Sequence, residues 1–168
     1  MKTKIICWHI GKKLYLCQRK KLENHQPKNK GMEYEIKIKE GLGAVRFGMP
    51  VEEVVALLGA AEEVESMENA LDEPTTVLHY EEGTVTLFFE GENPQLQCID
   101  LSAEEATLWG KELFSLTEKE VVQLMVQHEY YEQDADEEAW GERRITFGEG
   151  NIDFFFENDE LLAVVYGC

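Results

Sequence analysis

Histidine, cysteine and serine are the side chains of this chain that could act as nucleophile, general base or zinc ligand. The four cysteines, at positions 7, 17, 98 and 168, form no C-x-x-C pair, and they show no metal-like spacing with His9, His25, His79 or His128. The sequence contains no G-x-S-x-G elbow around a serine. We therefore predict no catalytic residue, no structural metal and no cofactor.

Carboxylates and glycine-rich segments give no clearer chemistry. The run DADEE at 134–138 suggests calcium, but an EF-hand loop beginning at Asp134 needs Gly at 139 and Glu at 145, where Ala139 and Ile145 stand. The segment GLGAVRFG lacks the Lys-Ser/Thr of a phosphate-binding loop. With 34 acidic residues in 168, a pair of carboxylates at glycosidase distance is expected by chance. These patterns make a hydrolase the weakest functional class.

Charge divides the chain into two parts. Residues 1–31 contain nine Lys or Arg and a single acid, Glu23, for a net charge of +8; the whole chain carries −18, so residues 32–168 carry −26. An acidic surface repels nucleic acids and anionic membranes, because affinity for phosphates comes mainly from Lys and Arg. It favours a basic protein partner, or it serves solubility alone. Both interpretations remain open.

The basic segment 1–31 resembles no secretion signal. Its apolar run IICWHI is six residues long, shorter than a signal-peptide core. We predict an N-terminal extension, disordered or non-native, that ends before Met32 and contributes nothing to the core; a basic nucleic-acid arm is the minority alternative. No run reaches the length of a membrane span. The expected location is the cytoplasm, or the periplasm or envelope if the true N-terminus carries a signal.

A repeat at an offset of 67 residues gives the predicted architecture. Between residues 43 and 90, 13 of 48 positions match their counterparts, and FGMPVEEVVALLG at 47–59 aligns with FSLTEKEVVQLMV at 114–126. Both segments have helical spacing of apolar residues, with Val54 and Val121 as equivalent anchors. Pro50 and Gly59 predict the ends of the first helix, and Thr117 with Glu120 predicts a capping box at the start of the second.

Alternating strands follow each predicted helix. They are TTVLHY, TVTLFFE and QLQCIDL in the first copy, and RRITF, NIDFFFE and LLAVVY in the second; YEIKI at 34–38 is a further strand. Residues 60–74 and 127–142 are expected to be acidic connectors. The predicted fold class is α+β: two tandem repeats of one helix plus a three-stranded antiparallel meander, in one continuous sheet with the helices on one face. The repeats comprise residues 32–104 and 105–168.

The segment FGMPVEEVVALLG resembles the G-M-[ST]-x-x-x-V-x-x-x-x-G signature of two related families. These are the SmpA/OmlA outer-membrane lipoproteins and the β-lactamase inhibitor proteins, which are tandem repeats of such a unit. Gly48, Met49, Val54 and Gly59 match the signature, and Pro50 replaces its usual Ser or Thr. The resemblance implies a protein-binding scaffold without catalysis.

Strand alternation predicts the binding surface. The set Val85, Leu87 and Phe89 must face the helices, so Phe88 and its counterpart Phe155 should lie on the opposite, open face and be partly exposed to solvent. The candidate partner-binding residues on that face are Val77, His79, Phe88, Glu90, Arg144, Asp153, Phe155 and Glu157. The alternatives are that a loop, the N-terminal segment or a second copy of the chain covers this face.

These observations favour a non-enzymatic binding protein. The leading hypothesis is an acidic inhibitor or immunity-type protein that binds a basic protein through the open face of its sheet, with homodimerisation as a further role of that face. An envelope or periplasmic accessory lipoprotein of SmpA/OmlA type is the alternative.

Overall fold

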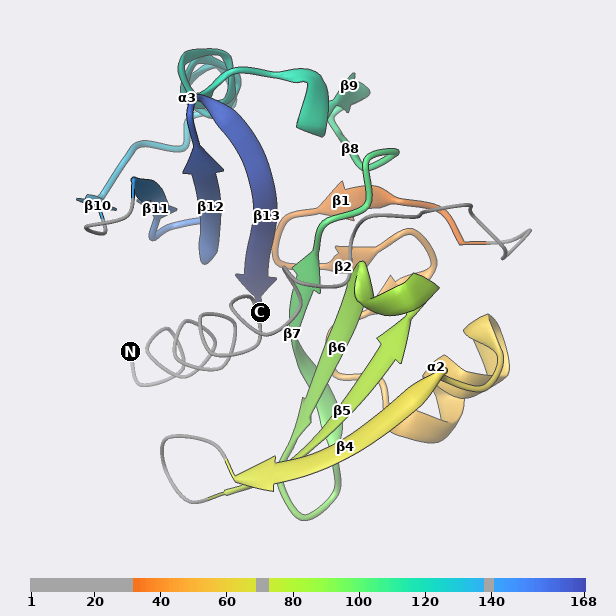
Figure 1. Cartoon of the computed structure of the whole chain (residues 1–168). Helices are drawn as coiled ribbons and strands as arrows, with labels where there is room; N and C mark the ends of the chain where they lie inside the picture. Colours follow the sequence, from red (N-terminus) through yellow and green to blue (C-terminus); the bar gives the residue numbers. More distant parts are fainter. Residues whose placement is uncertain (1–31, 69–72, 138–140) are drawn as a thin grey trace.

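A computed structural model of the chain describes residues 32–68, 73–137 and 141–168, and strands dominate it (Figure 1). The described residues form two sheets, of eight and five strands, and two α-helices. The six strands that the alternation predicts after the two helices are all present. Residues 1–31, for which we predicted a disordered or non-native extension, lie outside the described ranges.

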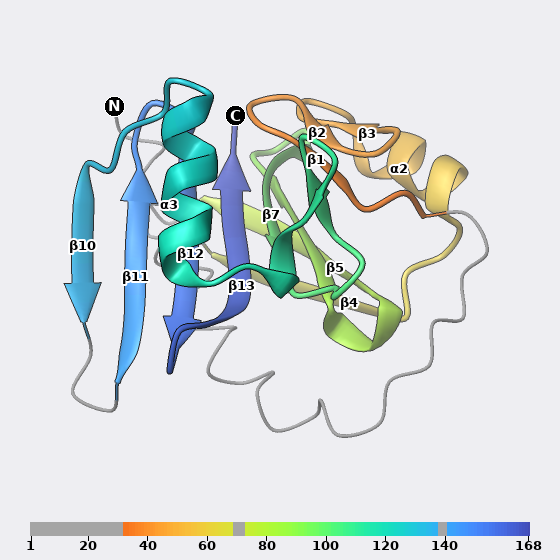
Figure 2. The same ribbon diagram turned by 90° about the horizontal axis from the view of Figure 1, so that it is seen from above.

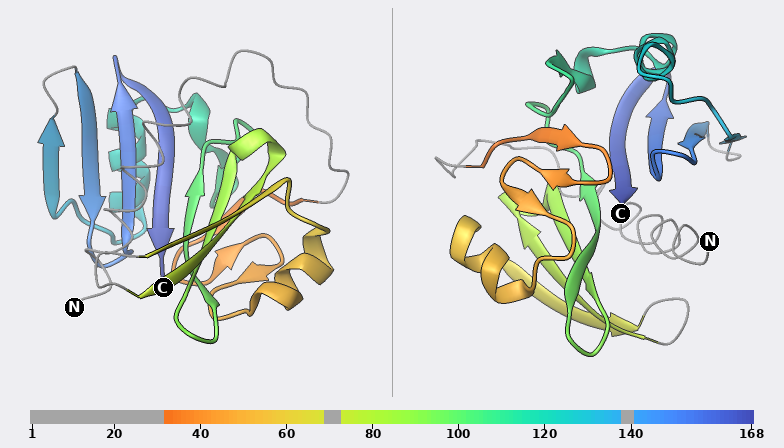
Figure 3. Two further views of the ribbon diagram at one scale, coloured as in Figure 1. Left: turned by 60° about the horizontal axis from the view of Figure 1, so that its bottom comes forward. Right: turned by 180° about the vertical axis from the view of Figure 1, so that it is seen from behind.

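The larger sheet is antiparallel throughout. From one edge to the other it contains β10 (Asp134–Glu137), β11 (Glu142–Phe147), β12 (Ile152–Glu157), β13 (Glu160–Gly167), β7 (Gln95–Leu101), β6 (Val85–Glu90), β5 (Pro74–Tyr80) and β4 (Glu63–Glu68). The C-terminal strand β13 pairs with β7, from Val164↔Leu101 to Gly167↔Cys98, and so joins the two four-stranded halves (Figure 3).

The smaller sheet consists of very short strands. Its order is β3 (Val45–Arg46), β2 (Gly41–Leu42), β1 (Glu35–Lys37), β8 (Thr107–Leu108) and β9 (Lys111–Glu112). Strands β1 and β8 are parallel, whereas the other pairs are antiparallel. This sheet is tied to the larger one by the Tyr166 hydroxyl, which donates to the carbonyl of Gly41 at 3.2 Å.

Both helices begin where the sequence predicts. Helix α2 (Val51–Leu58) follows Pro50, and Gly59 ends it in a left-handed conformation (φ 85°) that favours glycine. Helix α3 (Glu118–Gln127) begins with the predicted capping box, in which Thr117 and Glu120 satisfy each other's backbone N–H groups. Figure 2 shows α3 lying along strands β11 to β13. The Arg143 side chain of β11 donates to the Glu118 carboxylate of α3 at 2.9 Å.

The main hydrophobic core lies on the face of the larger sheet that we call the first face. Both helices contribute to it, through Val54 in α2 and through Val121, Leu124 and Met125 in α3. The smaller sheet adds Ile36, Leu42, Val45 and Leu108. The first face therefore has a complete second layer, made of helices and short strands.

The predicted fold class is wrong. The protein is mostly β with two sheets, whereas the sequence predicted α+β repeats of one helix and three strands in a single sheet. Each helix is followed by four strands of the larger sheet, because the expected acidic connectors contain β4 and β10. The predicted strand YEIKI forms β1, but in the smaller sheet and with a parallel neighbour.

Physical reasons explain why the sequence did not predict these strands correctly. Strand β10 is exposed along its whole length, and β4 buries no residue, so neither carries an apolar alternation. The strands of the smaller sheet are two or three residues long, too short to show any period.

Helix α2 provides a matched pair of substitutions that tests the first face. Val54 is fully buried, whereas Leu57 in the same helix is 50% exposed. Val54→Asp should lower the free energy of unfolding by about 3–5 kcal/mol, because it buries an unpaired charge, and Leu57→Asp by less than about 1 kcal/mol. Urea denaturation of both variants measures the difference. Equal effects would mean that α2 does not anchor this face.

Candidate functional site

The opposite face of the larger sheet, here the second face, carries its own apolar cluster. Its buried members come from five adjacent strands and are Val77, Phe88, Cys98, Phe155, Ala163 and Val165, with Met67 and Leu162 packed against them. Pairing across the strands places these side chains together, for instance Val77↔Phe88↔Cys98 and Phe155↔Ala163. We call this set the second-face cluster.

All eight candidate residues from the sequence lie on the second face. Val77, Phe88 and Phe155 are members of the cluster, and the other five stand on the same side of their strands. His79 pairs with Thr86, Glu90 with Thr75, Arg144 with Phe155, Asp153 with Val165 and Glu157 with Glu142. The alternation of residues therefore predicted one face across both halves of the sheet.

The predicted exposure of that face is wrong. Phe88 is 0% and Phe155 2% exposed, so neither aromatic ring is open to solvent. Alternation along a strand indicates which side a residue occupies, but it carries no information about what lies over that side. Replacing both residues by Ser would consequently damage the fold as well as any binding surface.

Two β-bulges change the alternation. The register shifts between Phe88 and Phe89 against β7, and between Phe155 and Phe156 against β13. The second shift places Leu161 in the first-face core and Leu162 against the second-face cluster, the reverse of what simple alternation along this strand gives. The extra residue of this bulge is Leu162 in β13, and a bulge leaves no recognisable mark in a run such as LLAVV, so the sequence could not predict the exchange.

Polar side chains surround the second-face cluster. His79 Nδ1 lies 3.1 Å from the Thr86 hydroxyl, and its Nε2 lies 3.8 Å from a Glu65 carboxylate oxygen. Arg144 forms ion pairs with two carboxylates of the edge strand β10, Asp134 at 3.2 Å and Asp136 at 3.7 Å. The one cationic side chain that the sequence assigned to this face is thus already neutralised by its neighbours.

Asp153 extends this polar margin. Burial raises the pKa of its carboxyl, although a hydrogen bond from Thr146 and the positive charge of Arg144 act in the opposite direction. The carboxylate therefore sits in a partly desolvated position next to the cluster.

Asp100 is a titratable residue of this face that the sequence analysis missed. It is only 3% exposed, it pairs with Thr86 on one side and Val165 on the other, and burial raises its pKa to about 7. Its Oδ2 atom has no hydrogen-bond partner among the described residues. The alternation of QLQCIDL does place Asp100 on the side of Cys98, which was the available signal.

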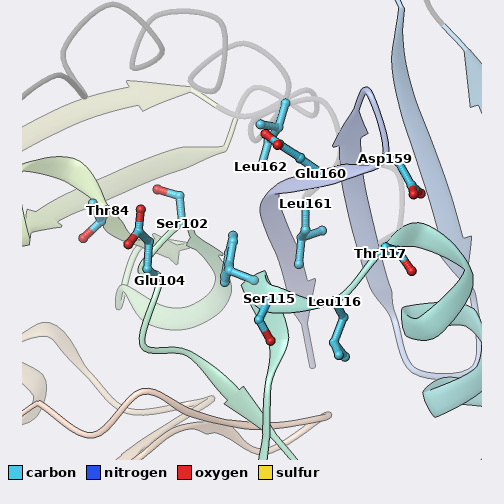
Figure 4. Close-up of a pocket in the computed structure, with 11 residues that line it drawn as sticks. Thr84, Ser102, Glu104, Ser115, Leu116, Thr117, Asp159, Glu160, Leu161 and Leu162 are labelled. Atoms are coloured by element: carbon cyan, nitrogen blue, oxygen red, sulfur yellow. The ribbon is translucent and has the colours of Figure 1, made fainter.

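A separate pocket of about 700 Å³ lies near the start of α3 (Figure 4). Its lining combines hydroxyls with carboxylates: Thr84, Ser102, Ser115 and Thr117 with Glu104, Asp159 and Glu160. Three of the hydroxyls have local roles, since Thr84 donates to the Glu81 carbonyl, Ser115 to the Glu112 carbonyl, and Thr117 caps α3. Asp159 accepts from the backbone N–H of Glu118 at 3.1 Å. These bonds stabilise the entry into α3.

Within the described ranges, no group of three or more His, Cys, Asp or Glu side chains is arranged to hold a metal ion. Asp134 and Asp136, which suggested calcium in the sequence, instead stand on edge strand β10 and bind Arg144.

Asp100 should make stability depend on pH. Because its folded-state pKa of about 7 lies above the unfolded value of 3.8, the folded protein holds this proton more tightly, and its stabilising effect is present at low pH and lost as the pH rises through 7. Asp100→Asn removes the titration. The unfolding free energy of the variant relative to wild type should therefore rise between pH 4 and 8, by up to about 4 kcal/mol. A difference that stays constant over this range would contradict the assignment.

Comparisons with known proteins add little to this description. No family model and no curated protein matches the sequence. One solved structure, an extracellular protein containing a SCP domain from Bacillus anthracis str. Ames, aligns with 88% of this chain at 10% sequence identity and a TM-score of 0.45. The alignment spans 49% of that protein, and a likeness of this size carries no argument about function. No helix in the described part of the chain is long and apolar enough to cross a membrane.

Proposed function

We propose that this chain is a non-enzymatic binding protein of inhibitor or immunity type whose partner is a basic protein. The observation that supports the proposal is the composition of the second face, where an apolar centre is surrounded by carboxylates. The acidic residues that stand on this side of their strands include Glu63, Glu65, Glu90, Asp100, Asp153 and Glu157.

The apolar centre would supply most of the affinity. Aromatic residues such as Phe88 and Phe155, packed among small side chains, are the kind of residue on which binding energy concentrates in protein interfaces. Both rings are buried in the structure, so a partner reaches them only after this face opens.

The acidic margin would act before that step. Glu63 and Glu65 lie on edge strand β4, opposite His79 and Val77, and Glu63 is exposed while Glu65 is partly exposed. A basic partner would be attracted to this edge over a distance set by the ionic strength. This attraction would raise the association rate more than the final affinity. The partner that fits this surface is a positively charged segment that also carries apolar side chains.

Charge reversal at the edge tests the proposal. Glu63→Lys with Glu65→Lys changes the second face, and Glu52→Lys with Glu53→Lys makes the same change on the exposed side of α2. Tagged forms of both variants and of wild type would be used to capture binding proteins from the native host, and the affinity of the captured protein would then be titrated. The second-face variant should bind about tenfold or more weakly than the α2 variant. Equal losses in both variants would contradict binding at the second face.

A further inference from the structure

The second-face cluster is buried although all its members belong to the larger sheet itself. Phe88, Cys98 and Ala163 are 0% exposed, and Phe155 is 2% exposed. The two helices and the smaller sheet contribute their buried side chains to the first face. Side chains that stand on one face of a sheet leave the solvent only under a second layer. No described element outside the larger sheet contributes a residue to the second-face cluster, so the described part of the chain does not account for such a layer.

Length restricts the choice of segment. Outside the described ranges lie residues 1–31, 69–72 and 138–140. The cluster extends over five adjacent strands, from β5 to β12, which corresponds to about 19 Å at the usual strand spacing. Segments of four and three residues that connect neighbouring strands cannot cover this width, whereas 31 residues can reach it in any backbone conformation.

The composition of residues 1–31 complements this face. Its apolar residues include Ile5, Ile6, Trp8, Ile10, Leu14 and Leu16, and its nine Lys or Arg side chains face a single acid. The second face offers the matching pattern of an apolar centre and a margin of carboxylates. Asp100 adds a specific site for a donor, because its buried Oδ2 atom has no hydrogen-bond partner among the described residues.

We propose that residues 1–31 bind the second face of their own chain, with their apolar side chains on the second-face cluster and their basic side chains toward its carboxylates. Attachment to the same chain gives the segment a high effective concentration, so even a modest intrinsic affinity keeps it bound. The inference concerns the same face as the proposed function but goes beyond it, since it needs no foreign protein. A basic partner would have to displace this segment.

The thiol of Cys98 reports on the proposed contact, because it lies at the centre of the cluster. In a full-length chain with Cys7, Cys17 and Cys168 replaced by Ser, Cys98 is the remaining thiol, and its alkylation rate after reduction measures access to the second face. Trp8→Asp with Ile10→Asp should raise this rate about tenfold or more, because buried thiols react only when their cover opens. The matched control, Leu57→Asp with Val126→Asp at exposed helix positions, should leave the rate unchanged.

A second form of the experiment removes the dependence on those substitutions. A specific protease site introduced at Gly31 allows the folded full-length chain to be cut. The released segment should remain bound at about 0.05 M salt and dissociate at about 1 M, with a parallel rise in Cys98 reactivity. Circular dichroism shows whether the remaining body keeps its strands. Should the aspartate variants fail to fold, this cleavage experiment decides the question.

Three results would overturn the inference. The first is a Cys98 that stays equally protected in the folded aspartate variant and after cleavage at high salt. The second is a segment that separates from the body as soon as it is cut, while Cys98 remains protected. The third is protection in the uncut chain that is lost on dilution, which would identify a second copy as the cover. None of these measurements uses a foreign partner, so their failure is separate from failure of the proposed function.

Discussion

The central strands of the larger sheet carry large apolar side chains on both faces, and this constraint governs the rest of the structure. In β6, Leu87 and Phe89 belong to the first-face core, while Phe88 between them belongs to the second-face cluster. In β12, Phe154 and Phe156 likewise flank Phe155. A sheet of this composition is stable in water only as the middle of three layers, because each apolar face must be buried. The two helices and the smaller sheet form one of the outer layers.

The acidic surface follows from the same arrangement. Both edge strands of the larger sheet, β4 and β10, are rich in carboxylates, and charged edges prevent other strands from pairing with an otherwise open sheet. Some of the net charge of −26 on residues 32–168 therefore protects the fold. The carboxylates around the second-face cluster are different, because Asp100 and Asp153 stand where burial raises the pKa of a carboxyl. A carboxylate at such a position destabilises the fold unless a hydrogen-bond donor or a positive charge compensates for its lost hydration.

The sequence predicted the parts of this structure that have a clear periodicity. It identified the six central strands, the capping box at Thr117 and Glu120, and the side of the sheet on which Phe88 and Phe155 stand. It failed where periodicity is absent or broken: in the acidic edge strands, in the two-residue strands of the smaller sheet, and at the bulge that moves Leu161 to the first face. It also could not predict that the second face is buried, because alternation along a strand carries no information about what lies over that side. For the same reason Asp100, an ordinary residue in the sequence, became noticeable only through its surroundings.

The proposed third layer depends on where residues 1–31 lie relative to the sheet, and paramagnetic relaxation measures this directly. A nitroxide attached at Cys7, in a full-length chain whose other cysteines are replaced by Ser, broadens the NMR signals of nearby nuclei, and the broadening falls steeply with distance. Layers packed on opposite faces of a sheet are separated by about 10 Å on each side, so the two faces should respond differently. We predict stronger broadening at Val77, Phe88, Phe155 and Val165 than at Val54 and Val121 on the first face. Broadening that is uniform, or that is strongest on the first face, would contradict the claim that the N-terminal segment forms the third layer.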